Sequence, residues 1–112
     1  MLPVKNRLTK DRDFKKINSK GKACFSSFLK IKYLANQLEN SRFGIVVSSK
    51  VSKKAVERNK LKRRIREIIR PELTHIVSGF DVVIFTTNKL LVLDFEQLKV
   101  EVMRALNKAK LC

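Results

Sequence analysis

The stretch from Lys53 to Arg70, KKAVERNKLKRRIREIIR, constrains the fold of this chain more than any other part of it. Its apolar residues are spaced i, i+4, i+7 and i+8, which places them on one face of a helix. They are Leu61, Ile65, Ile68 and Ile69, and the cations and amide across from them are Asn59, Lys62, Arg63, Arg66 and Arg70. This second row runs along about 16 Å of helix axis, at about 1.5 Å per residue. The pattern predicts a helix with one side on a core and the other facing outward.

The like charges on the outward face of this helix repel one another. Lys62 and Arg66 lie four residues apart, as do Arg66 and Arg70, and each such pair of like charges costs a few tenths of a kcal/mol. Only Glu57 and Glu67 offset the repulsion. A solvated helix face usually mixes both signs of charge, so this pattern favours a polyanionic partner, most simply a nucleic acid.

The positive charge of the whole chain is concentrated in two segments. Residues 1–32 and 50–70 each contribute +8 to the formal net charge of +16, and the remainder of the 112 residues is neutral. Two basic segments far apart in sequence indicate one folded basic surface, because a basic tail would place the charge at one end. The length and the 44% hydrophobic content predict a single globular domain spanning 1–112.

Several classes of protein are disfavoured by what the sequence lacks. No run is long and apolar enough to span a bilayer, and the N-terminus has no secretory apolar stretch. We therefore expect a cytoplasmic protein with no membrane partner, in which Cys24 and Cys112 are free thiols. Two cysteines and the single His75 make a zinc site implausible, and we expect no metal or cofactor on this chain.

The first half of the chain predicts a helix followed by two strands. The helix is expected to begin with Thr9 as its N-cap and to end at Gly21. Alternation predicts a long strand over 25–34, and a second strand is expected over 42–48. The polar segment 36–41 is expected to join the two strands as a hairpin.

The second half predicts helix, strand and helix. Ser52 is expected to cap the central helix, and Pro71 is expected to end it because it disfavours a helical residue before it. The apolar run 80–86 predicts a buried strand, and Asp94 with Gln97 resembles a capping box that opens the last helix. The order helix-strand-strand-helix-strand-helix indicates an α+β fold, a small mixed sheet packed by helices, with the last strand beside or near an earlier one.

One face of the predicted strand 25–34 combines a ring with two cations. The apolar Leu29, Ile31 and Tyr33 alternate with Phe28, Lys30 and Lys32. Such a face is ordinary for an exposed sheet surface, and it also suits single-stranded nucleic acid, whose bases stack on rings while cations meet its backbone. Because the cationic helix lies in the same chain, we favour the binding groove.

The run Ala55–Glu67, AVERNKLKRRIRE, resembles the signature helix of the protein subunit of bacterial ribonuclease P. That signature reads Arg-Asn-Arg, an apolar residue, Lys-Arg, two residues and Arg. This chain has Lys60 at the third position. Lysine keeps the positive charge but lacks the guanidinium group, which can bind a phosphate through two parallel hydrogen bonds. The resemblance extends from Asn6 to the end of the chain.

The resemblance implies an accessory protein of a ribonucleoprotein endoribonuclease. Such a protein assists removal of the 5′ leader of precursor tRNA, which generates the mature tRNA 5′ end. The RNA subunit would be the catalyst and would hold the magnesium, so the implied partners are ribonuclease P RNA and precursor tRNA. The implied fold is shared with a domain of a small-subunit ribosomal protein and has a left-handed strand–helix–strand crossover, whereas general rules predict a right-handed one.

The resemblance also assigns residues to two binding sites. The residues implied to bind the catalytic RNA are Arg58, Asn59, Lys60, Lys62, Arg63 and Arg66. Those implied to line a cleft for the leader are Phe14, Phe28, Lys30, Lys32 and Lys50. Some relatives have a second aromatic residue where this chain has Asn18. No catalytic residue is expected on the protein, because its carboxylates are scattered and His75 is alone.

Two other classes of function stay open. A ribosomal or other general RNA-binding protein could share the fold, although the signature helix argues against it. A DNA-binding module would need a second helix just before Lys53, in a helix-turn-helix arrangement. Strand and loop are expected there instead, so we expect no DNA partner.

Overall fold

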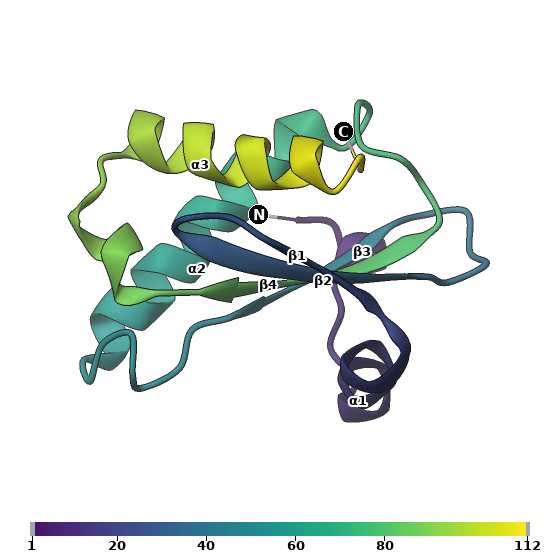
Figure 1. Ribbon diagram of the computed structural model, residues 1–112, viewed down its shortest axis with the longest axis horizontal. Helices are drawn as coiled ribbons and strands as arrows, with labels where there is room; N and C mark the ends of the chain where they lie inside the picture. Colours follow the sequence, from purple (N-terminus) through teal and green to yellow (C-terminus); the bar gives the residue numbers. More distant parts are fainter. Residues whose placement is uncertain (1, 112) are drawn as a thin grey trace.

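The computed structural model describes residues 2–111 and contains a four-stranded mixed sheet with helices on both faces (Figure 1). The strands are β1 (Lys22–Phe25), β2 (Leu29–Ala35), β3 (Arg42–Val46) and β4 (Phe80–Thr86), and the helices are α1 (Asp11–Lys20), α2 (Ala55–Ile69) and α3 (Phe95–Lys108). Short 3-10 turns occur at η1 (Val4–Asn6), η2 (Arg70–Glu72) and η3 (Asn88–Val92). The strand order is β1-β2-β4-β3, with β4 antiparallel to β2 and parallel to β3. The predicted α+β class is confirmed.

The strand β4 is central because it is apolar on both faces. Val82 and Ile84 are fully buried on the side of α2 and α3, and Val83 is buried on the side of α1. The main core lies between the sheet and the helix pair α2 and α3, and a smaller core lies between the sheet and α1 (Figure 1). The buried strand predicted over 80–86 is therefore confirmed.

The apolar stripe of α2 and the capping box of α3 also match their predictions. The apolar stripe of α2, from Leu61 to Ile69, is at most 4% exposed. At the start of α3, Asp94 Oδ1 accepts the backbone N–H of Gln97 at 2.8 Å, and Gln97 Oε1 accepts that of Asp94 at 3.0 Å. This is the predicted capping box. The α2 helix ends at Ile69, and Pro71 lies in the 3-10 turn that follows.

The long strand predicted over 25–34 is wrong. Residues 22–35 form the hairpin of β1 and β2, with a turn at 26–28 between them. Ser26 closes this turn, because its N–H donates to the Leu29 carbonyl at 2.9 Å and its Oγ accepts the Leu29 N–H at 3.3 Å. A serine that bonds to the nearby backbone favours a turn over a continuous ladder.

The hairpin predicted for segment 36–41 is also wrong, because β4 lies between β2 and β3. The segment instead crosses the start of β4 and binds it. Ser41 Oγ donates to the Val77 carbonyl at 2.7 Å and accepts the Phe80 N–H at 3.1 Å. The strands β3 and β4 pair in parallel and are connected by α2, which confirms the strand–helix–strand unit. The left-handed sense of this crossover stays a prediction.

Two predicted N-caps are wrong by one or two residues. The N-cap of α1 is Lys10 rather than Thr9, and that of α2 is Lys54 rather than Ser52. Neither lysine side chain makes a capping hydrogen bond. Ser52 acts just outside the helix, where its Oγ accepts the Lys54 N–H at 3.1 Å and donates to Glu57 Oε1 at 2.6 Å.

In the part of the chain that the structure describes, no helix has both the length and the apolar character needed to cross a membrane. Cys24 is a half-buried free thiol, and Cys112 lies outside the described residues.

Candidate nucleic-acid interface

The outer face of α2 is an open row of cations. Asn59 and Arg63 are exposed and Lys62 and Arg66 are half-buried, so the predicted face does point away from the core. Across residues 2–111, no carboxylate forms an ion pair with a lysine or arginine of α2. The structure leaves the positive field of this face available to an external polyanion.

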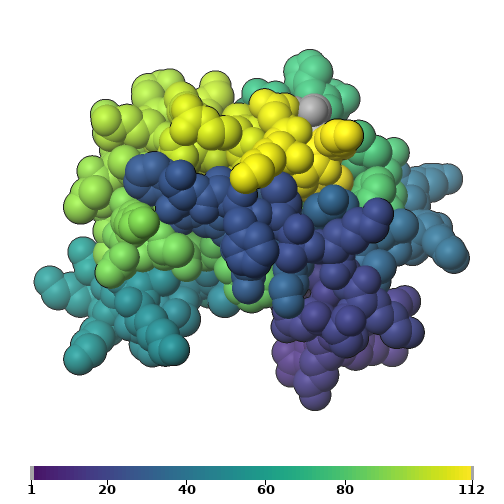
Figure 2. All heavy atoms as spheres, in the orientation of Figure 1, coloured from purple at the N-terminus to yellow at the C-terminus, as the bar shows by residue number. Residues whose placement is uncertain are grey.

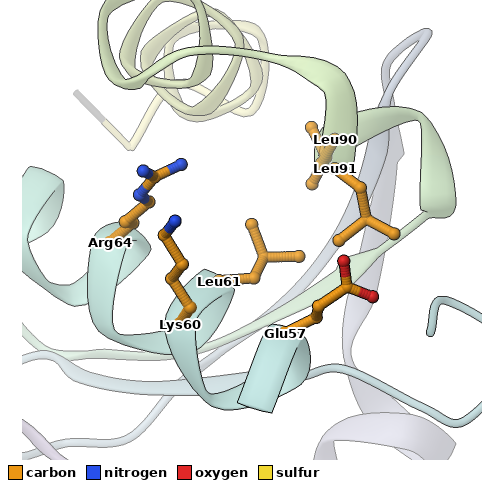
Figure 3. Close-up of a pocket in the computed structure, with 6 residues that line it drawn as sticks. All are labelled: Glu57, Lys60, Leu61, Arg64, Leu90 and Leu91. Carbon is orange, nitrogen blue, oxygen red and sulfur yellow. The ribbon is translucent and has the colours of Figure 1, made fainter. Parts of the chain in front are cut away.

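The two remaining residues of the predicted RNA-binding set lie apart from this row. The Nη1 of Arg58 donates to the Ser52 carbonyl at 2.8 Å, which ties the first turn of α2 to the preceding loop. Lys60 lines a hollow of about 120 Å³ between α2 and η3, next to Arg64 (Figure 3). Arg64 was not among the predicted residues, because it falls between the apolar stripe and the outer face of the helix.

A hollow lies on the opposite side of the sheet, between α1 and the segment around the start of α2 (Figure 2). The α1 helix packs closely on the sheet, since a Cβ at Gly44 would lie 2.6 Å from the Phe14 ring. At the other end of this face, Lys30 Nζ lies 4.5 Å from the centroid of the Phe85 ring and 5.9 Å from that of Phe25. Both separations fall within the range of cation–π attraction. We call Phe25, Lys30 and Phe85 the cleft floor.

The structure brings together part of the predicted leader-binding set. Phe14 of α1 is half-buried against the sheet. Lys32, on the same face as Lys30, donates from Nζ to the Asn18 carbonyl at 3.4 Å. Lys50 is exposed in the loop after β3. Lys30 and Lys32 therefore both add positive charge to the face of the sheet on which α1 packs.

Phe28 is the exception, and its predicted position on the cleft face is wrong. It lies in the turn before β2, so the alternation of that strand does not extend to it. Its ring packs against the main core and borders a hollow beside Leu93 and Gln97. Phe25 and Phe85 supply the rings on the cleft face instead. Phe25 could have been found from a correct hairpin, because its cross-strand partner is Lys30.

A partly buried ion network ties α1 to the sheet. Arg42 donates from Nε and Nη2 to the two carboxylate oxygens of Asp81 at 2.8 and 2.6 Å, and its Nη1 lies 3.5 Å from Asp13 Oδ2. The hydrogen bonds that Arg42 donates to Asp81 raise the pKa of Arg42, against the opposing effect of burial. Asn36 Nδ2 donates to the same Asp81 at 2.9 Å. These opposite charges neutralise one another, so the network positions α1 rather than binding RNA.

The arrangement of cations and rings is suited to binding polyanions. His75 is exposed and lies 3.3 Å from Glu72 of the same turn. Among the described residues, no three His, Cys, Asp or Glu side chains are grouped to hold a metal ion. The segment before α2 is a loop that follows strand β3, so α2 is not the second helix of a helix-turn-helix.

Comparison with known proteins decides between the remaining RNA-binding classes. The family model for ribonuclease P matches residues 2–110. The chain belongs to the ribonuclease P protein family. The ribonuclease P protein component of Pseudanabaena sp. is 38% identical over 98% of this chain and 96% of its own length. That of Synechocystis sp. is 48% identical over 74% of this chain and 68% of its own length.

Solved structures of ribonuclease P proteins share the fold. A mutant of the protein from Staphylococcus aureus has a TM-score of 0.90 at 28% identity, over 96% of this chain and 91% of that one. The protein from Thermotoga maritima, solved as a complex, has a TM-score of 0.82 at 37% identity, over 88% of this chain and 94% of that one. As a member of this family, the chain is the accessory subunit of an endoribonuclease, has ribonuclease P RNA as its partner, and functions in removal of the tRNA 5′ leader.

Proposed function

We propose that the cleft floor holds the single-stranded 5′ leader of precursor tRNA while the outer face of α2 binds the catalytic RNA. The observation that carries the proposal is Lys30, whose ammonium lies in cation–π range of two rings on the α1 side of the sheet. Rings on which bases stack, next to cations that meet the backbone, are the groups that single-stranded RNA requires. The cation would meet a phosphate while the exposed Phe25 receives a base.

The remaining residues take roles that follow from their positions. Phe14 would border the leader path, and Lys32 and Lys50 would contact leader phosphates. On α2, the residues proposed to contact the catalytic RNA directly are Asn59, Lys62, Arg63 and Arg66, with Lys60 at the η3 side. Arg58 would act partly by holding the loop before α2, since it already bonds to the Ser52 carbonyl.

The proposal leaves magnesium to the RNA subunit. The side chains at the cleft floor are a cation and two rings, whereas Mg²⁺ binds oxygen ligands such as carboxylates and phosphates. The protein would then raise substrate affinity by electrostatics and stacking. It would act in the cytosol, in keeping with the free thiol of Cys24.

The test is a cleavage assay with a bacterial ribonuclease P RNA at low magnesium, with the protein present or absent. The substrates are precursor tRNAs with a long leader and with a leader of a single nucleotide. We expect Phe25→Leu to raise KM about tenfold for the long leader, as expected for one lost stacking contact. The same change should leave the short-leader substrate almost unaffected.

Phe28→Leu is the matched control, because Phe28 lies on the opposite face of the sheet. It should leave the KM for both substrates close to that of the wild type. Equal losses for both substrates with Phe25→Leu would move the leader away from the cleft floor. A loss confined to Phe28→Leu would restore the prediction made from the sequence.

A further inference from the structure

A further cavity, of about 450 Å³, opens at the end of the sheet where β2 stops and β4 begins. Its walls come from segments far apart in sequence: the end of α1, the start of β1, and the turn after α3. It lies away from the cleft floor, because Tyr33 packs toward the α3 side of the sheet whereas Lys30 lies on the α1 side. Nothing in the proposed function uses it.

The floor of this cavity is aromatic and apolar. Tyr33 and Phe80 meet edge to face, with ring centroids 6.1 Å apart and an interplanar angle of 63°. Both rings are only half-buried, and Ala109 and Leu111 complete the floor. A half-open pair of rings is a surface on which a planar group can stack.

The rim of the cavity is cationic. Lys20, Lys22 and Lys110 line it, and no acidic side chain does. Lys22 is the direct cross-strand partner of Tyr33, so its ammonium can reach a group that lies on that ring. Within residues 2–111, none of the three lysines has an ion-pair partner. The rim therefore attracts an anion.

Lys110 occupies a backbone position that disfavours lysine. Its φ of 61° is in the left-handed region, and α3 ends in a Schellman motif, with Lys110 N–H bonded to the Asn107 carbonyl and Leu111 N–H to that of Leu106, both at 3.0 Å. Glycine is the usual residue at this position because it has no Cβ to clash. A lysine here costs stability and places a charge at the mouth of the cavity.

We propose that this cavity is a second nucleotide-binding site, which takes one unstacked nucleotide of a single-stranded RNA. The base would lie on Tyr33 and Phe80, and the phosphates would meet the lysine rim. A planar apolar group joined to phosphates matches both halves of the cavity, whereas a phosphate ion would leave the rings unused. The site would give the protein a contact with RNA beyond the cleft and α2.

The experiment is an NMR titration of the full-length protein with three probes: inorganic phosphate, adenosine monophosphate and a short oligoadenylate. We expect the adenosine probes to shift the Tyr33 ring and Ala109 methyl signals, and phosphate alone to shift only the backbone signals of the lysine rim. Tyr33→Leu should weaken adenosine monophosphate binding about tenfold, and Tyr33→Phe should keep it. The oligoadenylate should act at lower concentration than the mononucleotide.

Lys110→Gly separates a binding role from a structural one. It removes a rim charge and relieves the left-handed backbone, so the variant should melt at a higher temperature and yet bind adenosine monophosphate about threefold more weakly. The charge-matched control Lys89→Gln, on η3, should change neither property. Lys30→Gln should leave the Tyr33 shifts intact even if leader binding fails.

Three results would overturn the proposal. Equal shifts with phosphate and adenosine monophosphate would make the cavity an anion site only. Unchanged affinity in a folded Tyr33→Leu variant would remove the stacking surface. A response to the mononucleotide with none to the oligoadenylate would assign the site to a free nucleotide instead of an RNA strand.

Discussion

The helices α2 and α3 lie on the same face of one sheet and share one core, yet they differ in almost every other respect (Figure 1). α3 opens with a complete capping box, whereas the N-cap residue of α2, Lys54, makes no side-chain cap bond. α2 carries six Lys and Arg against two Glu, and α3 carries three against two. The charges of α2 are thus suited to an external anionic partner, whereas α3 mainly stabilises the fold.

The ion pairs point to the same division. Arg104 Nη1 donates to Glu101 Oε1 at 2.8 Å within α3, while no described carboxylate pairs with a cation of α2. The like charges of α2 therefore lower the stability of the free protein, and bound RNA would reverse that effect. A binding face and a stabilising face can be distinguished here by whether their charges are already neutralised.

The largest expected effect is one in which the two helices do not differ. Ile65 of α2 and Leu98 of α3 are at most 1% exposed in the same core. Replacing either with alanine should lower the free energy of unfolding by about 2–5 kcal/mol. Urea denaturation measures this loss. A much smaller loss for Ile65→Ala would mean that α2 docks loosely and that its apolar stripe contributes little.

The next effect should separate the two helices. If about six cations of α2 contact phosphates, the logarithm of RNA affinity should fall with that of salt concentration at a slope of about four to five. Arg63→Ala with Arg66→Ala should reduce that slope by about 1.5 and weaken binding about 10–100-fold at moderate salt. Filter binding of ribonuclease P RNA at several salt concentrations measures both quantities.

The charge-matched control for that pair is Lys89→Ala with Lys99→Ala, which removes two cations outside α2. It should leave the salt slope almost unchanged. If both double variants flatten the slope equally, RNA affinity depends on the net charge of the protein and not on contacts with the outer face of α2.

The contrast between the helices could be predicted from sequence because both signals are local. Residues 53–70 contain their apolar stripe and their cations within one stretch, and Asp94 with Gln97 forms a cap from residues three apart. The buried strand 80–86 was equally clear from its composition alone. Such features depend on periodicity and neighbouring side chains, so no knowledge of tertiary pairing was needed.

The errors concern pairing across the sheet. The insertion of β4 between β2 and β3 is decided by the burial of both its faces, which no local pattern in segment 36–41 records. Missing the Ser26 turn then placed Phe28 on the cleft face and hid Phe25. The network of Arg42 and Asp81 joins residues 39 apart, so it too depends on the strand order.

A smaller effect should be confined to the stability of α3. Asp94→Ala removes the side-chain acceptor of the capping box and should lower the free energy of unfolding by about 1 kcal/mol. RNA affinity should stay unchanged, because α3 presents no open cationic row. Paired measurements of unfolding and RNA binding test this. Weaker RNA binding by a fully folded variant would show that α3 also contacts RNA.

The smallest effect should come from giving α2 the cap that α3 already has. Lys54 has the extended backbone of an N-cap, with φ −86° and ψ 117°, so Lys54→Asn should fit and should raise the free energy of unfolding by about 0.5–1 kcal/mol. The change also removes one cation beside the proposed interface, so RNA affinity should fall slightly, about twofold to threefold. Lys54→Gln is the control, because it removes the same charge without adding a good cap. Equal stability of the two variants would mean that the bond between Ser52 and Lys54 N–H already serves as the cap of α2.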